Sequence, residues 1–238
     1  MNESDTIDGY QFYQNSLAAA NWGEEFVWSG DEQLPEELLQ FSIEVASQSF
    51  YAEQLGMLGA IRLTERCQDV GMRMHLASAI MDEARHTKVF FDYLKSKKST
   101  PQPPATHWNE INGEMGSGKS HLYGFYAHTM LENQALVSFE LLQNIFFPFD
   151  LGSVYKKVKN DEARHVKMGI EFIQKLSLET PKPRETLVQI HGEVMENCGI
   201  SDEACRYYAK YSELSDAQIK EKFVHRQSSM LKAVTGLP

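Results

Sequence analysis

Apolar and polar residues follow one another along this chain with the period of an α-helix. Apolar side chains recur three and four positions apart, and no convincing run shows the alternation typical of a half-buried strand. The pattern predicts an all-α protein. The long helices are expected over residues 35–69, 72–97, 119–146 and from a break at 147–152 to 178, and the shorter ones over 184–197, 202–211 and 215–233.

Proline and glycine mark the boundaries between these elements. Pro35 precedes the first long helix, a stretch rich in helix-breaking residues separates the second from the third, and Pro181 and Pro183 stop the fourth. We expect a single domain with three parts: an aromatic-rich N-terminal segment packed on the bundle (1–34), a four-helix core (35–178) and accessory helices (179–238).

The composition narrows the class of protein. The 238 residues are enough for one buried core, and 42% hydrophobic with 24% charged residues is typical of a globular protein. A formal net charge of -10 argues against a nucleic-acid partner. The three cysteines form no C-x-x-C pair, which argues against a cysteine-based metal site. Without a leader pattern or a long apolar run, we expect a cytoplasmic protein with no membrane partner.

A repeated motif carries the candidate chemistry. The letters DEARH occur at Asp82–His86 and again 79 positions later, at Asp161–His165. The same offset relates two further glutamates, Glu53 and Glu132. Each half of the chain therefore reads Glu, then Glu-x-x-His beginning 30 positions on, which indicates an internal duplication of a helix pair.

The spacing predicts that these residues meet. In an antiparallel hairpin, residues equally far from the turn lie side by side, and the midpoints between the paired glutamates fall at residues 68 and 147, close to the expected turns. Both glutamates of a pair then lie roughly 22 Å from the turn. The Glu and His of each motif share one helix face. Two hairpins packed face to face would bring all six side chains together.

Apolar residues flank these positions, so the six side chains are expected in the bundle core. Burying four carboxylates is prohibitive unless positive charge compensates, and two metal cations would supply it. Carboxylate oxygens with one imidazole for each metal favour iron or manganese. A single Glu-x-x-His usually marks only a solvated helix face, but two copies with matching upstream glutamates favour a metal site.

With these residues the chain resembles the ferritin-like di-metal carboxylate proteins, whose four-helix core contains two glutamates and two Glu-x-x-His motifs. The D-E-x-R-H form is most similar to bacterial multicomponent monooxygenase hydroxylases and ribonucleotide reductase small subunits. The resemblance covers about residues 35–175. It implies a ferritin-like bundle with additional C-terminal helices, and two iron ions, with manganese as an alternative in either position.

The resemblance also implies a role for each residue of the repeat. Asp82 and Asp161 would each orient the histidine of the opposite motif. Arg85 and Arg164 would either balance these acids or form surface salt bridges. The expected ligands are Glu53, Glu83 and His86 for one metal and Glu132, Glu162 and His165 for the other, with Glu83 and Glu162 as bridges.

Some positions depart from the related proteins or stay open. Phe90 stands where reductase subunits carry a radical tyrosine, and Leu136 where the hydroxylases have threonine. His128, one turn before Glu132, is either an additional ligand or a core histidine. Glu140 is a candidate for an extra carboxylate ligand, whereas Glu44 should face away from the site. Aromatic and apolar residues that could line a substrate pocket are Phe50, Met57, Phe90, Phe125, Phe139 and Phe172.

Residues Gly113–Ser120 match the phosphate-binding pattern G-x-x-x-x-G-K-[ST]. This motif needs a buried strand leading into the loop, and the preceding letters PPATHWNEIN do not read as one. We interpret the segment as a connection in which Ser117 or Ser120 caps the next helix.

The expected function is that of a di-iron oxygenase or oxidase that activates O2 and oxidises a small organic substrate. The chain carries no flavin or ferredoxin motif, so repeated turnover would need an external electron donor, and the sequence is compatible with a homodimer. Three alternatives stay open: a ferritin-like iron-binding ferroxidase, a radical-generating reductase-like subunit, and nucleotide hydrolysis at residues 113–120.

Overall fold

The computed structural model describes residues 9–26, 28, 34–104 and 119–236, and these residues form helices without any strand. The element order is α1 (Gly9–Ala19), α2 (Glu36–Arg66), α3 (Val70–Ser96), α5 (His121–Ile145), α6 (Asp150–Ser177), α7 (Pro183–Cys198), α8 (Asp202–Ala209) and α9 (Asp216–Thr235). The all-α class is confirmed, and the expected helices agree with the observed ones to within a few residues.

Two helical hairpins form the centre of the molecule, as the repeat predicts. Helix α2 packs along α3, and α5 packs along α6; α2 also contacts α5, and α3 contacts α6. The hairpin turns fall at residues 67–69 and 146–149. Asp69 begins α3 by accepting a hydrogen bond from the Met72 backbone N–H, and Ser120 begins α5 in the same way through Tyr123.

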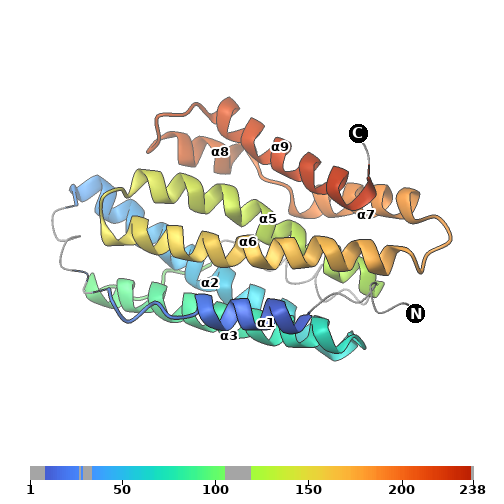
Figure 1. Ribbon diagram of the computed structural model, residues 1–238. Helices are drawn as coiled ribbons and strands as arrows, with labels where there is room; N and C mark the ends of the chain where they lie inside the picture. The colour runs from blue at the N-terminus through green and yellow to red at the C-terminus, as the bar shows by residue number, and fades with distance from the viewer. Residues whose placement is uncertain (1–8, 27, 29–33, 105–118, 237–238) are drawn as a thin grey trace.

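The remaining helices cover two sides of this bundle. Figure 1 shows α1 alongside α3, and α7, α8 and α9 over α5 on the opposite side. The N-terminal helix, which the periodicity did not predict, contacts α3 and α6. Among the helices of the described residues, none is both long and apolar enough for a membrane crossing.

The apolar core is divided by a polar layer. One cluster contains Ala60, Met72, Phe125 and Phe172, and a second contains Val45, Phe90, Phe139, Tyr155 and Val158. Along each of the four bundle helices, the residues of the repeated motif lie between these clusters. The bundle therefore places six polar side chains in the middle of a hydrophobic interior.

Candidate di-metal centre

The structure brings all six predicted ligand residues together. Glu53 comes from α2, Glu83 and His86 from α3, Glu132 from α5, and Glu162 and His165 from α6. Every one is buried, and the most exposed of them, Glu132, keeps only 7% of its surface.

Potential ligand atoms form two groups that share two carboxylates. Atoms of Glu53, Glu83, His86 and Glu162 lie within 4.8 Å of one another, and so do atoms of Glu83, Glu132, Glu162 and His165. The shared residues are Glu83 and Glu162, which the resemblance assigns as bridges. This arrangement offers two adjacent positions for cations, each with one histidine and one unshared glutamate.

The two histidines direct their Nδ1 atoms at these carboxylates. His86 Nδ1 lies 3.0 Å from Glu53 and 3.3 Å from Glu162. His165 Nδ1 lies 3.3 Å from Glu162 and 3.5 Å from Glu132.

The opposite nitrogens contact the aspartates of the repeat in a crossed pattern. His86 Nε2 lies 3.2 Å from Asp161, and His165 Nε2 lies 3.1 Å from Asp82. An imidazole that donates from Nε2 to a carboxylate presents its Nδ1 lone pair to a metal. The geometry is therefore the one expected when each aspartate orients the histidine of the other motif.

Both motif arginines bind both aspartates. Arg85 donates to Asp82 and, at 2.8 Å, to Asp161; Arg164 donates to Asp161 and, at 3.2 Å, to Asp82. The arginine side chains are 15% and 21% exposed. They are thus partners of the buried acids rather than surface ion pairs.

Trp22 closes one side of the site, whereas the sequence predicted only that its aromatic-rich segment packs on the bundle. Its indole N–H donates to Asp161 at 3.0 Å, and its ring stacks on His86 with centroids 5.7 Å apart. The Arg85 guanidinium lies 4.9 Å from the same ring. Trp22 lies outside the repeat, after α1, so motif spacing could not place it.

The charges of the cluster perturb one another. Burial together with the neighbouring carboxylates of Glu162 and Glu53 raises the pKa of Glu83 well above its usual value. Burial would lower the pKa of His86, but Glu53, Asp161 and Glu162 outweigh it and raise that pKa well above its usual value. Protons therefore occupy the cluster when no cation balances its carboxylates.

The residues fit a pair of cations. Glu162 Oε1 and His165 Nδ1 are buried polar atoms, and their polar neighbours 3.3 Å away do not meet hydrogen-bond geometry. Gly56 makes room for the shared carboxylate, because a Cβ at this position would lie 3.0 Å from Glu83. Closely spaced carboxylate oxygens and imidazole nitrogens of this kind are ligands that suit iron or manganese.

The structure shows where the residues lie that the sequence left as possible extra ligands or pocket residues. His128 is buried, and its Nε2 lies 3.0 Å from Glu132 Oε1. Glu140 is half exposed and pairs with Lys222, so the suggestion of an extra carboxylate ligand there is wrong. Glu44 is on the outer surface, as expected, and bonds to Tyr207.

Of the expected pocket residues, Phe90, Phe125, Phe139 and Phe172 are buried in the core clusters, whereas Phe50 and Met57 are only half-buried.

Most of the phosphate-loop match, residues 105–118, lies outside the described residues. Ser120 is the N-cap of α5, as expected for one of the two serines. Lys119 contacts Glu193 at 3.4 Å and lies over the ring of Tyr123.

A comparison with models of protein families finds no match, and neither does a comparison with curated proteins. Solved structures with a similar fold include variants of an R2-like ligand-binding oxidase. One with an aerobically reconstituted Mn/Fe cofactor has a TM-score of 0.77 at 15% identity, over 95% of this chain and 94% of that chain.

Two further variants of the same oxidase also have a fold similar to that of this chain. One with an anaerobically reconstituted Mn/Fe cofactor has a TM-score of 0.79 at 15% identity, and one with an Fe/Fe cofactor has 0.78 at 14%; each comparison covers 95% of this chain and 93% of that chain. The chain therefore has the ferritin-like helical fold of these di-metal proteins. The fold class expected from the sequence is confirmed.

Proposed function

We propose that this chain is a di-metal oxidase that reduces O2 at the centre of the bundle and oxidises a small organic substrate there. The observation that carries the proposal is the pair of overlapping, buried ligand groups joined by Glu83 and Glu162. Iron, or iron with manganese, is the metal that the donor atoms favour. Neighbours of the same fold that contain Mn/Fe or Fe/Fe cofactors support this choice.

Glu53, Glu83, His86, Glu132, Glu162 and His165 would hold the metal pair, which would supply the electrons for O2 reduction. The protein provides the rest. Asp82 and Asp161 fix the histidine rings, and Arg85 and Arg164 balance the aspartates. The apolar clusters above and below exclude water, which protects a reactive oxidant.

Catalysis over many cycles requires electrons from outside the chain. No flavin or iron–sulfur motif is present in the sequence, so we assign this task to a separate electron donor.

The direct test is O2 uptake after anaerobic loading with Fe2+. We expect wild-type protein to bind two iron ions per chain and to consume O2 in proportion to the iron pairs. Glu132→Ala removes one unshared ligand and should abolish most of this uptake. Glu140→Ala is the matched control, because it changes an exposed glutamate of the same helix. Equal O2 uptake by both variants would contradict the proposal.

Iron storage is the main alternative for such a site. A storage protein would assemble into a large shell and accumulate ferric mineral with continued Fe2+ addition. An oxidase would stop taking up iron at two ions per chain. Sedimentation of the iron-loaded protein and its final iron content separate these outcomes. A stable protein radical in electron paramagnetic resonance spectra after O2 exposure would instead favour a radical-generating subunit.

A further inference from the structure

A small cavity lies inside the bundle, beside two of the predicted metal ligands, Glu132 and His165. Its volume is about 10 Å³, close to the space that one water molecule needs. Three polar residues outside the set of six predicted ligands also line it: His75, His128 and Thr129. The cavity therefore offers polar walls to a very small ligand next to a predicted metal position.

His75 contributes a buried polar atom to the walls of this cavity. The residue is 4% exposed, and its Nδ1 makes no hydrogen bond with the part of the chain that the structure describes. Its ring packs edge-on against the ring of His165, with centroids 5.9 Å apart. Buried polar atoms usually have a hydrogen-bond partner, which can be a water molecule. A small polar ligand in the cavity would supply the partner that His75 lacks.

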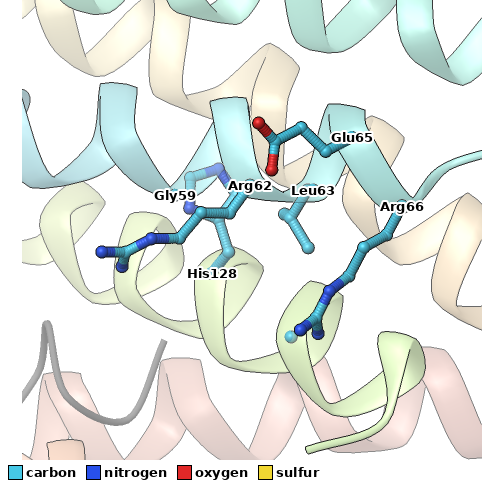
Figure 2. A pocket seen from close by; sticks show the side chains of 7 residues that line it. Gly59, Arg62, Leu63, Glu65, Arg66 and His128 are labelled. Carbon is cyan, nitrogen blue, oxygen red and sulfur yellow. The ribbon is translucent and has the colours of Figure 1, made fainter. Parts of the chain in front are cut away.

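His128 forms a second polar wall. It is buried on α5, and its Nε2 lies 3.0 Å from Glu132 Oε1. The same residue lines a larger pocket of about 230 Å³ between α2 and α5, and Figure 2 shows its ring reaching from α5 towards α2. His128 is thus shared by the inner cavity and the outer pocket. A ligand in the cavity would lie against an imidazole that already contacts a predicted metal ligand.

The duplication allows the two ends of the ligand cluster to be compared. Each residue of one hairpin has a counterpart 79 positions away in the other. We call the end beside Glu53 the first side and the end beside Glu132 the second side. Val154 is the counterpart of His75, so the first side lacks this polar group. The counterparts of Leu76, Ala79, His128, Thr129 and Gly169 are Tyr155, Val158, Ser49, Phe50 and Phe90, in that order. Apart from the serine, each of these is bulkier than the residue to which it corresponds.

The bulky residues of the first side are packed together. Tyr155 and Phe90 are completely buried, and their ring centroids lie 5.3 Å apart. On the second side the position of Phe90 is taken by Gly169, where a Cβ would clash with Thr129 Oγ1. The two halves of the repeat have therefore diverged. Aromatic rings fill the first side, whereas the second side contains a polar cavity.

We propose that dioxygen binds in this cavity, on the second side of the metal pair, and that His75 is its hydrogen-bond partner. The inference rests on the proposed oxidase function. An imidazole keeps at least one N–H donor in any protonation state, so His75 can donate to a small ligand. The two metal positions then have different tasks, because O2 approaches the one beside Glu132 and His165.

Azide, a small anion that binds ferric iron and adds an absorption band, is the probe for this site. The full-length chain is loaded with iron, oxidised with O2 and titrated with azide. His75→Val introduces the residue of the first side and removes a hydrogen bond, so azide binding should weaken about tenfold. Ala79→Val fills the cavity and should weaken it at least about tenfold. Ala84→Val is the matched control, an exposed position on the same helix, and should leave the azide affinity unchanged.

Crystals locate the ligand directly. Azide-treated crystals of the iron-loaded protein should show azide between His75 and the metal beside Glu132. Azide beside Glu53 and His86 would overturn the proposal, and so would a wild-type azide affinity in the two cavity variants.

The metal-free protein provides an arm that does not depend on iron. Its crystals should show an ordered water within hydrogen-bond distance of His75 Nδ1, and Ala79→Val should lose this water. A wild-type cavity without any ordered molecule would also overturn the proposal. Failure of the chain to bind iron or to consume O2 would refute the oxidase function separately, since the cavity water is observed without metal.

Discussion

At the scale of single residues, the two histidines of the repeat use their ring nitrogens for different tasks. Nε2 of each contacts an aspartate of the opposite motif, and Nδ1 faces the carboxylates. With a metal bound, the aspartate would therefore select the tautomer in which Nδ1 carries the lone pair. Because the two contacts cross between α3 and α6, each half of the duplication supports the ligand of the other half.

Replacing one orienting aspartate should weaken metal binding without removing a ligand. In Asp161→Asn, the side chain loses its charge towards Arg85 and Arg164 and holds His86 less firmly. We expect the metal affinity to fall about 10- to 100-fold. Competition with a coloured chelator measures this change. Asp92→Asn, at an exposed aspartate paired with Lys88, should leave the affinity unaltered, and an equal loss in both variants would refute the role given to Asp161.

Replacing Gly56 with alanine should disturb the metal site without disturbing helix α2. A methyl group at this position would lie 3.0 Å from the Glu83 carboxylate, so Gly56→Ala should displace this shared ligand and reduce the metal content. Gly192→Ala is the matched control, since its added Cβ meets nothing within 4 Å. The control should gain about 0.5–1 kcal/mol of unfolding free energy from helix propensity and keep its site. Metal analysis and thermal unfolding of both variants distinguish these effects.

The meeting of the six predicted ligand residues and both aspartates in the core could be predicted from the sequence because a duplication repeats their spacing. Glu140 was misjudged for a geometric reason: eight positions exceed two turns of 3.6 residues, which places it about 80° around the helix from Glu132. Trp22 and Gly56 could not be found, because their roles depend on the path of a loop and on the direction of one carboxylate.

At the scale of the elements, the hairpins set the height of the ligands in the bundle. The midpoint positions 68 and 147 fall in the observed turns between α2 and α3 and between α5 and α6. Sequence spacing could predict this because antiparallel packing turns equal distances along the chain into equal heights. Exact helix ends were harder to predict: α2 ends at Arg66, a few residues early, since Asp69 is used to begin α3.

Asp69 stabilises the first hairpin turn in two ways. It caps α3 through the Met72 N–H at 2.8 Å and pairs with Lys175 of α6 at 2.6 Å. Although burial opposes it, the hydrogen bonds from Lys175 and Met72 lower the pKa of Asp69 below its ordinary value of 3.8. Asp69→Ala should therefore cost about 1 kcal/mol of unfolding free energy at neutral pH.

The pH dependence of this effect has a definite sign. A carboxylate with a lowered pKa stabilises the folded state above its unfolded-state pKa, and the contribution is lost as the pH falls through the folded-state pKa. The difference between wild type and Asp69→Ala in urea unfolding should thus be constant near neutrality and shrink below pH 3.8. A difference that stays the same in acid would exclude the charged form as the source of the stability.

At the scale of the whole molecule, the bundle encloses four carboxylates between two apolar clusters. This arrangement is costly without cations, and the surrounding carboxylates raise the pKa values of Glu83 and His86 well above their usual values, which favours their protonated forms in the metal-free protein. The accessory helices and the N-terminal helix add cover on two sides (Figure 1). Sequence patterns predicted the three C-terminal helices only as lengths of chain, and the N-terminal helix only as part of an aromatic-rich segment packed on the bundle. The docking of these helices depends on scattered contacts rather than on a repeat.

Metal binding should stabilise the fold and release protons. At a free metal concentration of 100 times the dissociation constant, the gain is about 2.7 kcal/mol, and thermal unfolding with metal or with chelator measures it. Because Glu83 and His86 must lose their protons to bind metal, the gain should shrink as the pH falls. Glu132→Ala should show a much smaller gain. An equal gain in that variant would place the metal elsewhere.

Diffraction from crystals of the metal-loaded protein, measured on both sides of the iron and manganese absorption edges, shows whether the bundle holds a metal pair. We expect two anomalous peaks inside the bundle, one beside Glu53 and His86 and one beside Glu132 and His165, with Glu83 and Glu162 between them. Peaks confined to surface acidic residues, or a centre that stays free of metal in protein loaded with excess iron, would contradict this expectation.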